Sequence, residues 1–128
     1  MILCCGEALI DFLPRTGKDG ATLYQPFNGG SVYNTAIALG RLGNRTGLFT
    51  GLSTDFFGDM LREGLKASKV DLRYIKTWDR PSTLAFVKLT DGHARYSFFD
   101  DNSAGRMLSR RDLPRLEKAV SALHFGSI

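Results

Sequence analysis

Apolar and polar residues follow one another along this chain in short segments, and their period changes from strand-like to helical and back. Residues 1–10 form a nearly continuous apolar run, which is typical of a strand buried on both faces of a parallel sheet. A turn-rich segment, 12–20, comes next. Residues 21–27 then alternate loosely, and Pro26 among them favours an edge strand.

Two helical segments follow, separated by another apolar strand. From Ser31 the apolar residues recur at helical spacing as far as Gly43, which with the next asparagine predicts the helix end. Residues 46–52 are interpreted as a short strand. Asp55 and the two hydroxyl residues before it can cap a second helix, which we expect to end near Lys69. The order strand, helix, strand, helix predicts a parallel α/β arrangement with right-handed crossovers.

The pattern changes after residue 70. A short strand is predicted within 71–77, followed by two strongly strand-like segments, 82–90 and 94–99. Asp91-Gly92 between them is a hairpin signal, and no helix separates the two strands. We therefore expect an antiparallel flap attached to the parallel core.

The last part of the chain returns to the core pattern. Residues 109–122 carry leucines and a valine at helical spacing, so a helix is predicted there, with Ser109 or Asp112 as its cap and Pro114 in its first turn. Residues 123–128 look like the beginning of an apolar strand. A buried parallel strand normally leads into a covering helix, so we expect the fold to continue beyond the last residue.

Composition narrows the class of protein. The chain has 128 residues, of which 43% are hydrophobic and 23% charged, as in an ordinary globular domain or a piece of one. Lysine and arginine outnumber aspartate and glutamate by 17 to 13, but they are scattered, which argues against a nucleic-acid track. No apolar stretch approaches membrane-spanning length, so no membrane partner is expected.

The two cysteines of the chain, Cys4 and Cys5, are adjacent in the first apolar run. Adjacent cysteines rarely pair with each other, so neither a disulfide framework nor a four-cysteine metal site is expected. Reduced, buried thiols are typical of a cytoplasmic protein, and no signal peptide is recognised because acidic residues interrupt the N-terminal run early.

Candidate binding residues gather at two places. Asp11 follows the first apolar run, and ligands of open α/β sheets bind outside the carboxyl ends of strands, although a helix or turn cap is the alternative. Gly29 and Gly30 open the first helix, where backbone N–H groups without helical partners suit an oxygen-rich ligand. Asn34 lies one turn further on, so its amide can point at the same ligand. The alternatives are an ordinary tight turn for the glycines and a surface position for Asn34.

Four ordered segments resemble those of a known family. They are GEALIDFLP at 6–14, GGSVYNTAIALGRLG at 29–43, STDFFG at 53–58 and LHFGSI at 123–128. The chain thus resembles the N-terminal part of a ribokinase-like (PfkB family) carbohydrate kinase, most like a fructokinase. Val32 and Ser53 depart mildly from the family pattern.

The resemblance implies an α/β, ribokinase-like three-layer fold: a parallel central sheet plus a small antiparallel β flap, or lid, with the C-terminal half missing. Residues 1–128 would be the N-terminal portion of one such domain. Its core would comprise 1–11, 29–70 and 106–128, and its lid strands about 12–28 and 82–100. The family's glycine-rich, aspartate-containing motif has no match here, so the general base is expected in the missing half.

The resemblance also implies roles for residues in this chain. Backbone and polar groups would hold sugar hydroxyls, and flap aromatics would pack on the apolar face of the ring, the alternative for the aromatics being core or a dimer surface. The expected substrate-binding residues are Asp11, Gly29, Gly30, Asn34, Tyr96, Phe98 and Phe99. No catalytic, cofactor-binding or metal-binding residue is expected in this chain.

The implied activity is ATP- and Mg²⁺-dependent phosphorylation of a small neutral sugar, most plainly fructose. Asp100 and Asp101 stand where related kinases of sugar acids tend to carry an arginine, which favours the neutral sugar. Another sugar, a sugar acid or a nucleoside is the alternative substrate. A homodimer through the lid is expected. A non-catalytic, truncated sugar-binding or interaction module is the alternative function, and the 128-residue chain alone is expected to be inactive and to self-associate.

Overall fold

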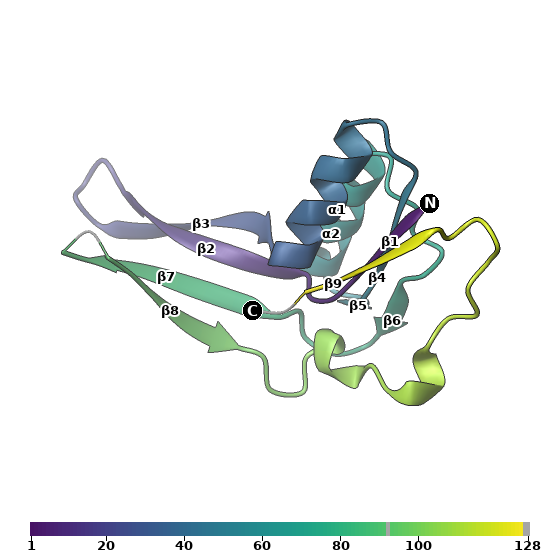
Figure 1. Ribbon diagram of the computed structural model, residues 1–128. Coiled ribbons are helices and arrows are strands. Elements are labelled where there is room, and N and C mark those ends of the chain that lie inside the picture. The colour runs from purple at the N-terminus through teal and green to yellow at the C-terminus, as the bar shows by residue number, and fades with distance from the viewer. Residues whose placement is uncertain (92, 127–128) are drawn as a thin grey trace.

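Residues 1–91 and 93–126 are described by the computed structural model, which contains three small sheets and two α-helices (Figure 1). The helices are α1 (Ser31–Arg41) and α2 (Phe56–Ala67), with two short 3₁₀ turns, η1 (Ala104–Met107) and η2 (Arg110–Asp112). The strands are β1 (Ile2–Cys5), β2 (Leu9–Thr16), β3 (Thr22–Gly29), β4 (Thr46–Phe49), β5 (Gly51–Ser53), β6 (Lys76–Trp78), β7 (Leu84–Thr90), β8 (His93–Phe99) and β9 (Ala122–Phe125).

A parallel sheet with strand order β4-β1-β9 forms the centre of the molecule. Helices α1 and α2 lie together on one of its faces, as Figure 1 shows. The predicted α/β class with a parallel sheet is confirmed. The strand predicted from Leu123 is also confirmed as β9, while Ser127 and Ile128 lie outside the described residues.

The prediction of one strand over residues 1–10 is wrong. The apolar run divides at Gly6 and Glu7 into β1, which is central in the parallel sheet, and β2, which belongs to a second sheet. The predicted turn-rich segment is also largely strand, since β2 continues to Thr16 and only the residues after it turn back into β3. Alternation of inward and outward side chains allows Asp11 to lie within the strand rather than after it.

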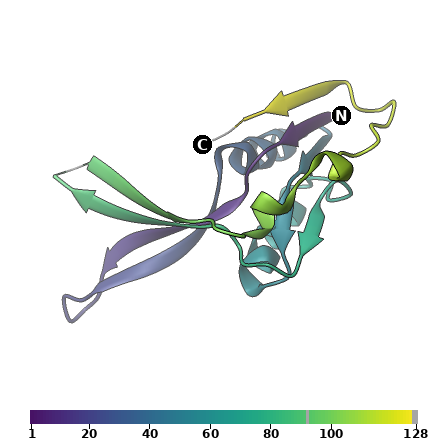
Figure 2. The same ribbon diagram turned by 90° about the horizontal axis from the view of Figure 1, so that it is seen from below.

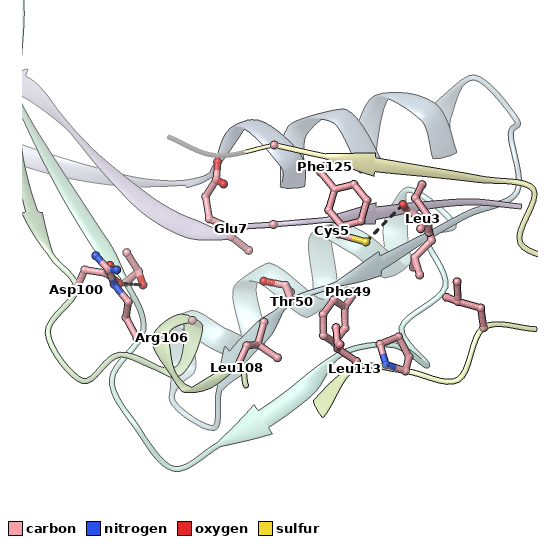
Figure 3. Close-up of a pocket in the computed structure, with 18 residues that line it drawn as sticks. Leu3, Cys5, Glu7, Phe49, Thr50, Asp100, Arg106, Leu108, Leu113 and Phe125 are labelled. Atoms are coloured by element: carbon pink, nitrogen blue, oxygen red, sulfur yellow. Dashed lines mark hydrogen bonds and ion pairs between the residues drawn. The ribbon is translucent and has the colours of Figure 1, made fainter. Parts of the chain in front are cut away.

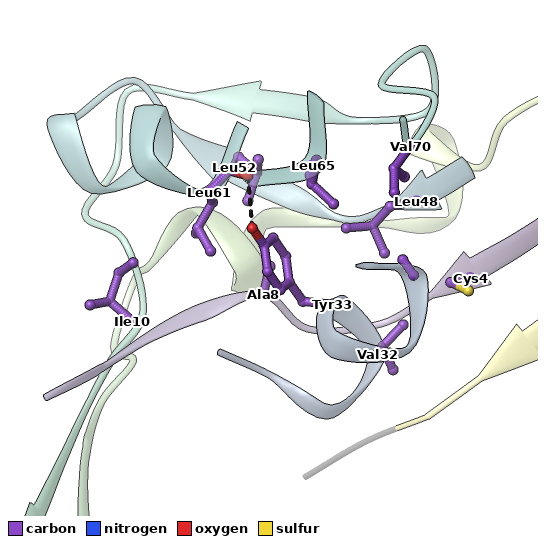
Figure 4. Packing of buried hydrophobic residues seen from close by; sticks show 11 residues of the cluster. Cys4, Ala8, Ile10, Val32, Tyr33, Leu48, Leu52, Leu61, Leu65 and Val70 are labelled. Carbon is purple, nitrogen blue, oxygen red and sulfur yellow. Dashed lines mark hydrogen bonds between the residues drawn. The ribbon is translucent and has the colours of Figure 1, made fainter. Parts of the chain in front are cut away.

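Apolar side chains from β1, β2, β4, β5 and the two helices meet in one core, drawn in Figure 4. Tyr33 of α1 is buried at its centre, and its hydroxyl donates to the Leu61 carbonyl oxygen at 3.0 Å. A buried tyrosine of this kind needs a partner for its hydroxyl, and α2 supplies it. The buried members are Cys4, Ala8, Ile10, Val32, Tyr33, Ala36, Leu48, Leu52, Leu61, Leu65 and Val70.

The second sheet has strand order β3-β2-β7-β8 and extends away from the helices (Figures 1 and 2). It consists of two antiparallel hairpins, β2-β3 and β7-β8, joined by a parallel pairing of β2 with β7 over Ile10–Phe12. The predicted antiparallel hairpin of β7 and β8 and the predicted edge position of β3 are confirmed; Gly92, at the hairpin signal, lies outside the described residues.

Two further strand predictions are refined by the structure. The segment 46–52 divides at Thr50 into β4, in the parallel sheet, and β5, which pairs with β6 in a separate two-stranded sheet. The strand expected within 71–77 is β6, shifted to Lys76–Trp78, and Asp71 makes only an isolated bridge to Gly47.

The helix predicted over 109–122 is wrong. Ser109 and Asp112 do form the capping box of a helix start, but only the 3₁₀ turn η2 follows. Leu113 already has extended backbone, with φ −55° and ψ 127°. Proline disfavours helical backbone in the residue before it, so Pro114 explains why the turn ends at that point.

Among the described residues, neither helix has the length and apolarity needed to cross a membrane.

Candidate functional site

A pocket of about 310 Å³ lies where β2, the start of α1 and the β7-β8 hairpin come together. Its walls are Glu7, Leu9, Asp11, Gly30, Ser31, Tyr96 and Phe98. We call it the Asp11 pocket. It combines two carboxylates, a helix start and two aromatic rings, which can bind a small ligand that is polar on its edges and apolar on one face.

Asp11 reaches this pocket because of the register of the second sheet. It lies opposite Phe27 on one side and Ala85 on the other, and Ala85 lies opposite Phe98. Residues directly opposite one another point to the same face of a sheet, so Asp11 and Phe98 share a face. Burial raises the pKa of the Asp11 carboxyl above its ordinary value.

Glycine is required at position 29 by the close approach of Asp11, and at position 30 by the backbone geometry. A Cβ added to Gly29 would collide with the Asp11 carboxylate. Gly30 is the N-cap of α1 with φ +102°, a region that favours glycine, and a Cβ there would lie 2.9 Å from the Glu7 carbonyl oxygen. Both glycines therefore bring the helix start against β2, with Gly30 in the wall of the pocket.

Glu7 is a pocket residue that the sequence analysis missed. Its Oε1 accepts hydrogen bonds from the backbone N–H of Ser31 at 2.7 Å and from the Ser31 hydroxyl at 2.9 Å. Gly30 has no side chain with which to cap α1, so a carboxylate from the β1–β2 connection does so. The available signal was an acidic residue that interrupts a nearly apolar run just before Asp11.

The aromatic residues of β8 divide between the two faces of the sheet. Tyr96 and Phe98 line the Asp11 pocket, with their rings stacked at a centroid distance of 5.9 Å and an angle of 14°. Phe99 points to the other face, where its ring meets Phe86 edge-on at 5.5 Å. Strand alternation places neighbouring residues on opposite faces, so Phe99 is separated from the other two.

Of the predicted site residues, the structure brings together Asp11, Gly30, Tyr96 and Phe98, with Gly29 against Asp11. Asn34 and Phe99 do not line the pocket. The Asn34 backbone N–H donates to the Gly30 carbonyl oxygen at 2.9 Å, and its side chain is exposed one turn into α1.

The base of the β7-β8 hairpin is held by two aspartates outside the pocket. Asp55 caps α2 by accepting from the Gly58 N–H at 2.8 Å, and it also accepts from the N–H and hydroxyl of Ser82 at 2.9 and 2.7 Å. Burial alone would raise the pKa of Asp55, but these hydrogen bonds outweigh it and lower that pKa. Asp55 was expected to be a cap, and it additionally fixes the residue that leads into β7.

Asp100 holds the other strand at the base of the hairpin, directly after β8. It accepts from the hydroxyls of Thr83 and Ser103, each at 2.6 Å, and from the Arg106 guanidinium. Burial would raise its pKa, yet these donors lower it. Asp100 does not line the Asp11 pocket, and Asp101 is an exposed loop residue. The argument for a neutral sugar from these two aspartates is therefore not supported by their positions.

A larger pocket, of about 720 Å³, lies on the face of the parallel sheet opposite the helices (Figure 3). We call it the sheet-face pocket. Its walls are mostly apolar and come from β1, β4, β9 and the 105–116 segment, including Leu3, Phe49, Leu113 and Phe125. Phe125 is 69% exposed and Leu113 is 64% exposed, so this apolar face is open to solvent.

The described residues contain no group of three or more histidine, cysteine, aspartate or glutamate side chains placed to hold a metal ion. The mostly apolar walls of the sheet-face pocket also do not suit a polyphosphate.

Comparison with known proteins identifies the family to which this chain belongs. Residues 1–126 match the pfkB family carbohydrate kinases, and the chain belongs to this family. It is 55% identical to a fructokinase of Rhizobium leguminosarum bv. trifolii over 128 residues, which are 100% of this chain and 39% of that protein. A probable fructokinase-2 of Arabidopsis thaliana is 36% identical over 138 residues, with 100% of this chain and 41% of that protein covered.

Solved structures agree with this assignment. The fructokinase of Xylella fastidiosa superposes with a TM-score of 0.85 at 30% identity, covering 97% of this chain and 40% of that one. A putative ribokinase II of E. coli, solved in complex with ATP and Mg²⁺, gives a TM-score of 0.77 at 25% identity. The match covers 88% of this chain and 38% of that one. The fold is therefore the ribokinase-like α/β fold, and the chain spans about two fifths of the length of these relatives.

Proposed function

We propose that the whole protein containing this chain is an ATP-dependent fructokinase, and that this chain supplies its sugar-binding part. The observation that carries the proposal is the meeting of Asp11, Gly30, Tyr96 and Phe98 in one pocket of a chain that is 55% identical to a fructokinase. The whole protein is proposed to act in the cytoplasm.

The chemistry of the pocket supports a sugar as its ligand. A carboxylate such as Asp11 can accept hydrogen bonds from two adjacent hydroxyls, and a backbone N–H at the glycine pair can donate to a third oxygen. The exposed faces of Tyr96 and Phe98 can cover the apolar C–H face of a sugar ring. Asn34 is proposed as a sugar ligand through a rotation of its exposed side chain. Phe99, expected to bind the sugar, is instead proposed as part of the lid, because its ring meets Phe86 on the other face.

The two hairpins of the second sheet are proposed to act as the lid. Their movement toward α1 would exclude water around the acceptor hydroxyl, which protects a phosphoryl donor from hydrolysis. ATP, when bound, would supply the phosphoryl group with Mg²⁺ balancing its charge. The general base and the nucleotide-binding residues are proposed to lie in the part of the protein that its relatives have and this chain does not span.

The test is phosphorylation of sugars by the full-length natural gene product, followed by ADP release and by the mass of the sugar product. Fructose is expected to be the preferred acceptor over glucose, ribose, gluconate and adenosine. Asp11→Asn is expected to lower kcat/KM for fructose at least about tenfold, because one charged acceptor of hydroxyl hydrogen bonds is removed. Asp59→Asn, which alters an exposed ion pair with Arg62, is the matched control.

Phosphorylation of adenosine or a sugar acid in preference to fructose would contradict the proposed substrate. A full-length product that binds fructose without ATP-dependent turnover would favour the second candidate, a non-catalytic sugar-binding module. That candidate rests on one observation: residues of this chain bring a carboxylate and two aromatic rings together in one pocket.

A further inference from the structure

Two carboxylates line the Asp11 pocket, and only one of them was anticipated. Glu7 and Asp11 are the charged residues among the described walls of the pocket, and neither forms an ion pair with a lysine or arginine in the described part of the chain. A ligand in this pocket therefore meets negative charge from two directions.

Glu7 also changes what the start of α1 can attract. The N-terminus of a helix ordinarily favours an anion, because its first N–H groups lack helical partners and the helix dipole is positive there. Here the Ser31 N–H, in the first turn, donates to Glu7 Oε1 at 2.7 Å, so an anion supplied by the protein already occupies that position. An anionic ligand would have to displace it or lie beside it.

We propose that Glu7 is a specificity-determining residue that excludes anionic sugars, namely sugar acids and sugar phosphates, from the Asp11 pocket. This inference rests on the proposed function, since it concerns the sugar of the same site. Glu7 does so by neutralising the positive end of α1 and by adding its charge to that of Asp11. Hydroxyl groups are tolerated because carboxylates accept their hydrogen bonds.

Removal of the Glu7 charge should therefore raise the affinity for an anionic sugar relative to that for a neutral one. In Glu7→Gln the side-chain oxygen can still accept from the Ser31 N–H, so the helix start keeps its partner. A ligand carboxylate beside Glu7 would be repelled by its like charge, so removal of that charge favours an anionic ligand. The affinity for gluconate relative to fructose is expected to rise about fivefold or more.

The experiment uses the full-length natural gene product and measures its affinity for fructose. It then measures how well glucitol and gluconate, which differ mainly in charge, compete with fructose for binding. The wild-type protein is expected to bind glucitol more tightly than gluconate, and Glu7→Gln to reduce that difference. Glu63→Gln, at an exposed position on α2, is the matched control and should leave it unchanged. Glu7→Ser is a second neutral variant, and whichever variant folds decides the result.

Wild-type protein that binds fructose but admits gluconate as readily as glucitol would overturn the inference while leaving the proposed function intact. So would a folded Glu7→Gln protein that binds fructose with the wild-type preference between the competitors. Wild-type protein that neither binds nor phosphorylates any neutral sugar would instead refute the proposed function, and the inference with it. Equal loss of affinity for all three ligands in Glu7→Gln would assign Glu7 to structure alone and contradict a role in selectivity.

Discussion

The Asp55 Oδ1 atom accepts a hydrogen bond from the Ser82 hydroxyl at 2.7 Å, which ties the first turn of α2 to the residue that precedes the β7-β8 hairpin. The same oxygen caps α2 through the Gly58 N–H, while Oδ2 accepts from the Ser82 N–H. One carboxylate thus fixes the hairpin to the core. Loss of this group should affect both a helix and the hairpin.

Substitution Asp55→Ala is expected to destabilise the protein by about 2–4 kcal/mol, because it removes a helix cap and leaves the Ser82 groups without their acceptor. The measurement is urea unfolding monitored by circular dichroism. Asp59→Ala, in the same turn of α2 but 67% exposed, should cost well under about 1 kcal/mol. Equal losses in both variants would contradict the role given to Asp55.

Acid should loosen the base of the hairpin through Asp55 and Asp100. Both carboxyls have a folded-state pKa below the ordinary value of 3.8, so each contributes stability that is fully present above that value. This stability is lost as the pH falls through the lower folded-state pKa. The free energy of unfolding should therefore decline below about pH 4, and the decline should be shallower in Asp100→Asn, as urea titrations at several pH values would show. An unchanged slope in that variant would refute this assignment.

The ionised carboxylate of Asp11 should affect stability in the opposite direction to those of Asp55 and Asp100. Its folded-state pKa is raised by burial, so the ionised carboxylate at neutral pH is held at a cost to stability. Asp11→Asn should leave the thermal midpoint at pH 7 unchanged or higher while sugar binding falls. A parallel loss of stability and binding would indicate a structural rather than a ligand-binding role for this carboxylate.

Substitution of the neighbouring residues Phe98 and Phe99 of β8 should have different effects on sugar binding. Phe98→Ala should weaken fructose binding several-fold because its ring lines the Asp11 pocket, whereas Phe99→Ala should affect binding little because its ring contacts Phe86 on the other face. Titration calorimetry of the full-length protein with fructose measures both. If Phe99→Ala proves the more damaging, the lid must approach the sugar with its other face.

The isolated 128-residue chain is expected to self-associate through its open apolar surfaces. The sheet-face pocket exposes Phe125 and Leu113, and contiguous exposed apolar area drives association. Sedimentation velocity should show species larger than 14.1 kDa. Phe125→Lys should reduce them if the sheet face is responsible, whereas Phe99→Lys should reduce them if the chain forms the homodimer expected through the lid. A wild-type monomer at high concentration would contradict both.

Local patterns predicted the elements that depend on neighbouring residues. The spacing of apolar residues gave α1, and the strand-like segments around Asp91 gave the β7-β8 hairpin. The predicted helix at 109–122 failed because Pro114 acts on the backbone of Leu113, an effect that outweighs apolar spacing. Propensity is a weak guide where a single residue blocks the helical backbone.

The pocket was only partly predictable, for a different reason. Asp11 and the glycine pair stand at positions where the sequence itself indicates a ligand. The position of Glu7 depends on which way the chain bends at residue 6. The position of the Phe99 ring depends on the face of β8 to which its side chain points. A one-residue change of strand register exchanges the two faces, and the sequence does not determine that register by itself. Only the assembled sheet separates Phe98 from Phe99.

The second sheet has the form of a fork, since its two hairpins diverge beyond their junction in Figure 2. In the described part of the chain, β2 and β7 are in register only from Ile10 to Phe12, opposite Leu84 to Phe86. Any twisting or spreading of the two hairpins relative to each other is therefore concentrated in these three residue pairs, and the middle pair contains Asp11. The carboxylate proposed to bind the sugar thus lies at the junction of the two hairpins, so a change in the angle between the hairpins would change its position.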